Sequence, residues 1–185
     1  KIRIYENNAG VWTYSDQISA SSGSYFGRSF NLIDNTVLVC SGDSSDGRAR
    51  IYQNSGTGDW GLSQMDVDSY NVDGGMNVQY FCYYGIALSS QYAMIYGRSN
   101  NNYNRKIYIF ESIAGTWSST VAAELSGASL GINFNCHVNS GQMAMTDTYA
   151  AFITCSDLHI LENQAGNWVL MTSVNIGYII NPTFF

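Results

Sequence analysis

All four tryptophans of the chain stand in one recurring phrase, and this repeat limits the possible folds more than any other feature of the sequence. Each copy contains an apolar pair, Glu or Gln, Asn or Ser, a short turn, and then Gly, one variable residue and Trp. The glycines are Gly10, Gly58, Gly115 and Gly166, and the tryptophans are Trp12, Trp60, Trp117 and Trp168. A period of about 50 residues is typical of proteins built from stacked supersecondary units.

Each copy of the phrase predicts a β-hairpin. Apolar residues alternate before the turn, as in Ile2 and Ile4 or Ile107 and Ile109, which is the pattern of a strand with one buried face. Asn and Gly in the turn accept left-handed backbone conformations. The Trp opens the return strand, and we expect its ring to lie over its own hairpin. The expected hairpins are at residues 2–18, 49–65, 107–121 and 158–172.

A second pair of strands is expected between successive hairpins. Its first strand begins at a glycine, which is Gly27, Gly85 or Gly141, and a polar turn then leads to a more continuous apolar strand such as residues 36–40. Four short strands in about 50 residues match one blade of a β-propeller. No segment predicts a helix, so we expect one all-β domain over residues 1–185.

The order of these segments resembles the FG-GAP repeats, which build β-propellers in integrin α-subunit heads and in many secreted or surface proteins. The copy that carries the resemblance runs from Tyr25-Phe26-Gly27-Arg28-Ser29-Phe30 through residues 37–42 to residues 47–52. The later copies keep the glycine and the hydrophobic pattern but lack the Phe-Gly pair. The resemblance implies a propeller, and a propeller by itself implies no particular activity.

Two features depart from that family, whose members commonly carry Asp-x-Asp-x-Asp-Gly calcium loops and usually close seven blades. The nearest candidates here are residues 43–47 and 66–74, and neither has the spacing to surround Ca²⁺ with about six to eight oxygens. We therefore expect solvated loop carboxylates and no metal site. The chain of 185 residues is also too short for seven units of this size.

The last unit is incomplete, because one further strand is indicated at residues 175–181 and the sequence then stops at Phe185. We therefore expect a small propeller of about four blades of four short antiparallel strands, with one blade split between the N- and C-termini. Two alternatives stay open: a neighbouring subunit completes the blade by strand addition, or the protein continues beyond residue 185. The candidate clasp or subunit-contact residues are Ile2, Ile4, Tyr5, Tyr178, Ile179, Ile180, Phe184 and Phe185.

Catalytic motifs are absent from the sequence. It contains no nucleophile elbow, HExxH, Walker or dinucleotide-binding fingerprint. His159 takes a hairpin position that holds Arg or Tyr in other copies, so it is expected to be a strand-face residue. Glu6, Glu111 and Glu162 take equivalent repeat positions, which indicates a structural role, such as binding the turn, rather than a glycosidase pair. We expect no enzyme and no cofactor.

The cysteines Cys40, Cys82, Cys136 and Cys155 lack the paired spacing of a zinc site. Buried thiols and disulfides both fit, and four cysteines allow about three pairings. The chain begins at Lys1 rather than Met, which indicates a processed or excerpted chain.

Charge and the length of the apolar runs argue against two kinds of partner, nucleic acids and the membrane interior. The 8 Lys and Arg residues against 14 Asp and Glu form no basic cluster, so nucleic-acid binding is not expected. No apolar run approaches the roughly 18 residues of a membrane-spanning helix. The low charged fraction of 12% and the bias toward Tyr, Asn, Ser and Gly indicate an extracellular or cell-surface protein.

Three functional hypotheses follow. The first is a non-enzymatic surface module for adhesion or structural self-assembly, including a filament subunit that shares its terminal strands. The second is a lectin-like propeller with Asn100, Asn101, Asn102 and Tyr103 as a candidate ligand loop. The third is a carboxylate-dependent hydrolase. The expected partner is therefore another copy of the chain, another surface protein or a glycan.

Overall fold

The computed structural model describes residues 1–19, 25–42, 45–56, 58–73, 78–99, 104–134 and 143–177, without the side chains of residues 62–64 and 99. One short helix, α1 (Gly127–Leu130), follows the eleventh strand. The strands are β1 Ile2–Asn8, β2 Val11–Ile18, β3 Phe30–Ile33, β4 Thr36–Ser41, β5 Arg48–Asn54, β6 Trp60–Asp68, β7 Val78–Gln79, β8 Ile86–Leu88, β9 Tyr92–Ser99, β10 Arg105–Ile113, β11 Thr116–Ser126, β12 Met143–Met145, β13 Tyr149–Thr154, β14 Asp157–Gln164 and β15 Asn167–Asn175.

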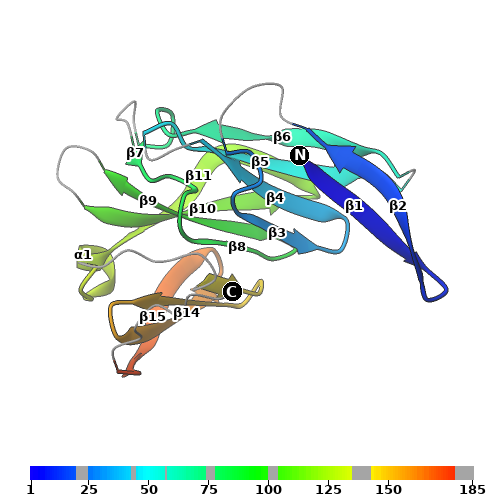
Figure 1. Cartoon of the computed structure of the whole chain (residues 1–185). Coiled ribbons are helices and arrows are strands. Elements are labelled where there is room, and N and C mark those ends of the chain that lie inside the picture. Colours follow the sequence, from blue (N-terminus) through cyan, green and yellow to red (C-terminus); the bar gives the residue numbers. More distant parts are fainter. Residues whose placement is uncertain are drawn as a thin grey trace.

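One hairpin and three antiparallel sheets follow one another along the chain (Figure 1). The hairpin is β1–β2, and the sheets have the strand orders β3-β4-β5-β6, β7/β8-β9-β10-β11 and β12-β13-β14-β15, with β7 and β8 both paired to β9. The tryptophan phrases lie on the hairpins β1–β2, β5–β6, β10–β11 and β14–β15. The all-β class predicted from the sequence is confirmed.

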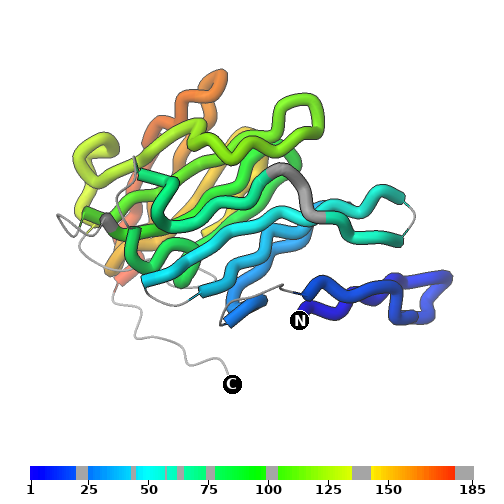
Figure 2. Tube along the Cα trace, turned by 90° about the horizontal axis from the view of Figure 1, so that it is seen from above, coloured from blue at the N-terminus to red at the C-terminus, as the bar shows by residue number. Residues whose placement is uncertain are grey.

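The sheets pack on one another in chain order, and a separate apolar cluster fills each contact. One cluster joins the hairpin to the β3–β6 sheet, a second joins that sheet to the β7–β11 sheet, and a third joins the β7–β11 sheet to the β12–β15 sheet. Figures 1 and 2 show the hairpin at one end of this row and the β14–β15 strands at the other. The described residues therefore form an open row rather than a closed ring.

The tips of three hairpins are two-residue turns with left-handed backbone. Ala9 and Gly10 have φ values of 52° and 89°, and the same Ala-Gly pair forms the turns of β10–β11 and β14–β15. The Asn7 side chain accepts a hydrogen bond of 2.7 Å from the Gly10 N–H. A turn of this hand matches the twist of the paired strands, which explains the Gly in these three phrases.

The sequence pattern aligns Gly85 with Gly27 at the start of the first strand of each unit, and this alignment is wrong. The Gly27 N–H donates to the carbonyl of Cys40, and the matching bond one sheet later runs from the Cys82 N–H to the carbonyl of Tyr96. Gly27 and Cys82 have φ values of 80° and 62°, so Cys82 rather than Gly85 takes the place of Gly27. This copy thus has Phe-Cys where the repeat motif has Phe-Gly. The third glycine of the predicted set, Gly141, lies outside the described residues.

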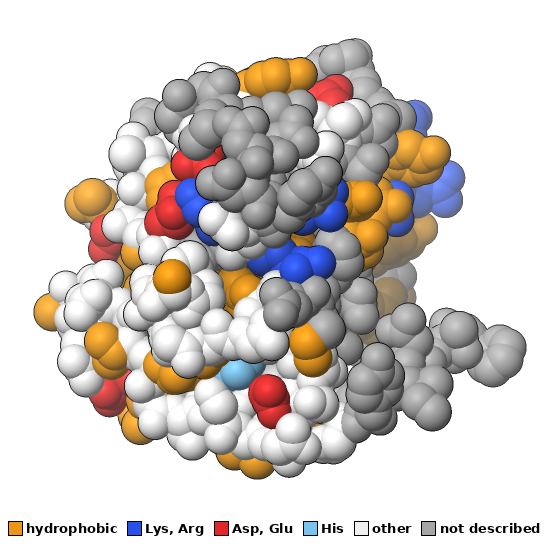
Figure 3. Space-filling view, turned by 90° about the vertical axis from the view of Figure 1, so that its left-hand side faces the viewer, with side chains coloured by type: hydrophobic (Ala, Val, Ile, Leu, Met, Phe, Trp, Pro, Cys, Tyr) orange, Lys and Arg blue, Asp and Glu red, His pale blue; other side chains and the backbone are white. Residues whose placement is uncertain are grey.

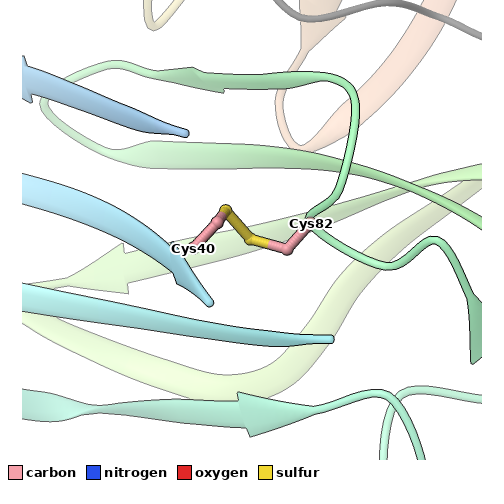
Figure 4. The surroundings of a disulfide bond; sticks show 2 residues. All are labelled: Cys40 and Cys82. Atoms are coloured by element: carbon pink, nitrogen blue, oxygen red, sulfur yellow. A yellow bond between two sulfur atoms is a disulfide. The ribbon is translucent and has the colours of Figure 1, made fainter. Parts of the chain in front are cut away.

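A disulfide bond joins Cys40 of β4 to Cys82 in the loop before β8, and it ties together two consecutive sheets (Figure 4). Cys155 is also disulfide-bonded, whereas Cys136 lies outside the described residues. Of the two possibilities that the sequence left open, disulfides therefore hold for these three cysteines.

Two elements were not expected from the sequence. The helix α1 corrects the prediction that the chain contains no helix: the Ser126 side chain accepts a hydrogen bond from the Ser129 N–H at its start, and Gly131 ends it with a φ of 67°. The two-residue strand β7 pairs with the end of β9 beside Arg98 and Ser99.

Candidate functional site

Each repeat unit presents two different faces to its neighbours. Ile109 on β10 belongs to the cluster shared with the following sheet, whereas the next residue, Phe110, belongs to the cluster shared with the preceding sheet. Ile51 and Tyr52 on β5 show the same division one unit earlier. We call the side toward the following sheet the forward face and the side toward the preceding sheet the rear face.

The repeated tryptophans lie on the rear faces. Trp117 and Trp168 are 1% and 3% exposed, and each packs in the cluster shared with the preceding sheet. Trp60 packs in the same way against the cluster that contains residues of the hairpin. Each ring of these three therefore packs between its own hairpin and the preceding unit, a contact that the sequence did not predict. Trp12, in contrast, is 67% exposed.

The rear face of the β1–β2 hairpin forms an uncovered aromatic patch. Tyr5 and Tyr14 are 48% and 55% exposed and lie opposite each other in the register, with their ring centroids 5.9 Å apart. Trp12 lies on the same face, because two residues of β2 separate side chains on one side of a strand. Among the four units, this is the one whose rear face meets no sheet within the described residues.

The forward face of the β12–β15 sheet likewise meets no other sheet among the described residues. Tyr149 and Val174 are each 46% exposed on this face, and Leu158 and Ile160 beside them are partly exposed. Tyr149 holds the position that Tyr92 holds one sheet earlier, since both lie opposite the glutamate of the phrase. Sequence reasoning missed these residues, although their repeat positions could have marked them as contact residues.

A free strand edge and an apolar groove lie beside the hairpin. The strands that correspond to β1 each pair on both sides, and they are β5, β10 and β14. Among the residues that the structure describes, β1 pairs only with β2. Ile2, Ile4 and Tyr5 line a cavity of about 110 Å³ between β1 and β3, together with Phe30 and Leu32, which are 58% and 56% exposed. Three of the residues predicted as a subunit contact thus border this groove.

The remaining predicted contact and ligand residues lie outside the described part of the chain. They are Tyr178, Ile179, Ile180, Phe184 and Phe185 of the predicted clasp and Asn100, Asn101, Asn102 and Tyr103 of the predicted ligand loop.

The repeated glutamates each accept a hydrogen bond from a neighbouring side chain. The Glu6 carboxylate accepts from Ser15 at 2.8 Å, and that of Glu111 accepts from the Tyr92 hydroxyl at 3.2 Å. Glu162 accepts from the Gln164 amide at 2.9 Å. Their partners are therefore side chains rather than the N–H groups of the turns, and the arrangement is that of residues that support the hairpins.

Two carboxylates from the second of the loops that were compared with calcium loops form ion pairs. Asp66 pairs with Arg48 at 2.5 Å and with Arg50 at 3.2 Å. Burial alone would raise the pKa of Asp66, but the hydrogen bond from Arg48 and the charge of Arg50 outweigh it and lower this pKa. Asp73 pairs with Lys106 at 3.1 Å. Across the described ranges, no group of three or more His, Cys, Asp or Glu residues is arranged to hold a metal ion.

His159 is a buried strand residue with both ring nitrogens occupied. Its side chain is 2% exposed, and Nε2 and Nδ1 lie 2.6 Å from Thr154 Oγ1 and 2.8 Å from Ser173 Oγ. Burial lowers the pKa of His159 and favours the neutral ring. Through these two contacts the residue links its own strand, β14, to the neighbouring strands β13 and β15.

Basic side chains gather in the middle of the molecular face shown in Figure 3, close to acidic side chains. Lys106 bonds to Glu124 at 2.8 Å in addition to Asp73, and both Lys106 and Glu124 border a polar pocket of about 330 Å³ between β10, β11 and α1. Cations and carboxylates therefore lie next to each other around this pocket.

No helix within the described residues has the length and hydrophobicity needed to cross a membrane. Comparison of the chain with protein-family models, with curated proteins and with solved structures gives no match.

Proposed function

We propose that the chain is a non-enzymatic module of the β-propeller type that serves structural self-assembly or adhesion outside the cell or on its surface. One observation carries the proposal: both ends of the row of sheets present uncovered apolar surface. Trp12 is 67% exposed at one end, whereas Trp117 at the corresponding position inside the row is 1% exposed. Exposed patches of this kind mark protein contact sites.

The order and packing of the units support the propeller assignment. Each full sheet is an antiparallel meander, and the first strands β3, β8 and β12 neighbour one another across the sheets. Blades arranged around one axis have this relation. On this proposal the β1–β2 hairpin is the outer half of a blade whose inner half comes from elsewhere.

Strand sharing is the proposed means of assembly. The outer edge of β1 has no strand partner in the described part of the chain, and the groove lined by Ile2, Ile4 and Leu32 offers apolar contacts beside it. An extended apolar segment can complete such an edge by β-strand addition. We propose that residues 178–185 of a neighbouring copy supply it, which makes a head-to-tail contact.

The disulfide bond between Cys40 and Cys82 supports the proposed location. Disulfides persist in oxidising compartments, such as the cell exterior, and are rare in the reducing cytosol. The covalent link between two consecutive sheets also suits a subunit that must hold its shape in an assembly.

Light scattering combined with negative-stain microscopy tests the proposal. The native protein is expected to form particles larger than one chain of 20.4 kDa, as a ladder of oligomers or as fibres. A variant that lacks residues 178–185 is expected to lose most of this association, whereas Ile113→Ser, at an exposed hairpin tip, is expected to retain it. A native protein that stays at 20.4 kDa at every concentration would contradict the proposal.

Glycan binding is a second candidate function, favoured by a cluster of tyrosines and arginines. The guanidinium of Arg28 lies 3.5 Å from the ring centroid of Tyr83, and the Tyr80, Tyr83 and Tyr84 rings contact one another. Aromatic rings with polar groups at their edges suit sugar stacking. A glycan array that gives signals for the native protein but not for Tyr83→Ala would support this function over assembly alone.

A further inference from the structure

We infer that two copies of the chain associate face to face, with the rear face of β1–β2 in one copy covering the forward face of β12–β15 in the next. This inference rests on the proposed self-assembly and adds the contact surface and its direction. A shared strand alone would leave both of these apolar faces in water.

The contacts between consecutive units inside the chain all have the same orientation. In all three of them the forward face of one unit meets the rear face of the following unit. Within the described residues, one rear face and one forward face are left uncovered, at opposite ends of the row. These two surfaces are the two halves of the contact that the chain already makes three times.

Individual residues show how closely the halves correspond. The Trp168 ring meets Tyr92 edge-on, with centroids 5.4 Å apart and planes at 89°, and the two side chains are 3% and 6% exposed. Trp12 holds the position of Trp168, and Tyr149 holds that of Tyr92, but these two are 67% and 46% exposed. Trp12 of one copy is therefore expected to lie against Tyr149 of the next copy in the same edge-on arrangement.

The two faces differ in chemistry, and this sets the symmetry of the contact. The rear face is aromatic, with Tyr5, Trp12 and Tyr14, whereas the forward face also holds aliphatic side chains such as Ile160 and Val174. Two unlike surfaces make a heterologous contact, which leaves one face free at each end and lets the assembly grow.

A complementation experiment tests the inference. Trp12→Ser removes the centre of the rear face and leaves the forward face intact, whereas Tyr149→Ser does the reverse. Each variant alone is expected to sediment as one chain of 20.4 kDa. An equimolar mixture is expected to form a particle of twice that mass that grows no further. Ile113→Ser, with the same 67% exposure as Trp12 but a place at a hairpin tip inside the row, is expected to assemble like the native protein.

The other possible outcomes distinguish a failure of this face-to-face contact from a failure of the proposed self-assembly. If both single variants assemble like the native protein, the face contact is wrong, and assembly through the shared strand alone stands. If each variant is monomeric but the mixture is monomeric too, the contact does not join a rear face to a forward face, and the inference is overturned. If the native protein is itself monomeric, both the inference and the proposed function fail. Circular dichroism of each variant establishes that it is folded.

Discussion

The same repeat position behaves in opposite ways in the middle and at the ends of the molecule. Trp168 and Tyr92 close an internal contact and are almost fully buried, whereas Trp12 and Tyr149 carry the same side chains in water. The backbone pairing around them is alike, since each residue opens a strand of an antiparallel hairpin or sheet. The difference arises from the presence or absence of a neighbouring sheet, so a core position becomes a contact site where the row ends.

The largest expected effect comes from truncating a tryptophan inside the row. Trp117→Ala should lower the free energy of unfolding by about 3–5 kcal/mol, because it removes a ring that is 1% exposed and leaves a cavity. Trp12→Ala in dilute monomeric protein should lower it by less than about 0.5 kcal/mol, as at other exposed positions. Urea unfolding followed by far-ultraviolet circular dichroism measures both. Equal costs at the two positions would refute the comparison.

The next largest effect is expected from the disulfide that joins the β3–β6 sheet to the β7–β11 sheet. Replacing Cys40 and Cys82 by serine should lower the free energy of unfolding by about 2–4 kcal/mol, because the bond closes a loop of 42 residues in the unfolded chain.

A matched variant tests whether Cys82 truly takes the place of Gly27. Cys40→Ser combined with Cys82→Gly should be more stable than the double serine variant by about 0.5–1 kcal/mol, since glycine accepts the φ of 62° without strain. Thermal unfolding at one pH compares the two. A lower stability for the glycine variant would disprove the assigned equivalence.

A smaller effect is expected from the ion pairs on β5 and β6. Asp66→Asn should lower the free energy of unfolding at pH 7 by about 1–2 kcal/mol, because Arg50, whose side chain is 7% exposed, keeps its charge without that partner. The partly exposed Arg48 contributes less.

The pH dependence of stability gives a second readout of the same carboxylate. The pKa of Asp66 is lowered in the folded protein, so its contribution is complete above the unfolded value of about 4 and is lost as the pH falls through the folded value. The native protein should therefore lose stability on acidification more steeply than Asp66→Asn. Parallel profiles would mean that Asp66 has no such role.

The smallest effect belongs to the stacking contact between the loops of two consecutive sheets. Arg28→Gln should lower the free energy of unfolding by about 0.5–1 kcal/mol, because it removes the cation that lies 3.5 Å from the Tyr83 ring centroid. Arg28→Lys, which keeps the charge, should recover part of the loss. A measured change of several kcal/mol would show that this contact carries more of the internal junction than the tryptophans do.

The hairpins and the all-β class could be predicted because their signals are local. Alternating apolar residues and a Gly in each turn are readable within about 15 residues of sequence. The helix α1 was missed because one turn held by a Ser126 cap and Gly131 has no hydrophobic period. The equivalence of Cys82 with Gly27 was missed because the first-strand glycines suggested another alignment. The matching backbone hydrogen bonds and the positive φ of both residues correct it.

The exposed end faces could not be predicted for a different reason. Ile160 and Ile109 are each followed by an apolar residue and a glutamate, and Trp12 has the same local pattern as Trp168. Which of them is buried depends on how many sheets pack on each unit, and this is a property of the whole row. The sequence did direct attention to Ile2, Ile4 and Tyr5 as candidate contact residues, and all three line the groove beside β3.

Acrylamide quenching of tryptophan fluorescence tests the central claim most directly, with Trp12→Phe used to isolate the contribution of Trp12. In dilute native protein, the difference between the two should be a strongly quenched component, because Trp12 is the most exposed of the tryptophans. That component should become protected as the concentration rises, and it should remain accessible in Tyr149→Ser. If Trp12 is as protected as Trp117 and Trp168 in dilute monomer, its face is covered within a single copy, and the account of two open ends is wrong.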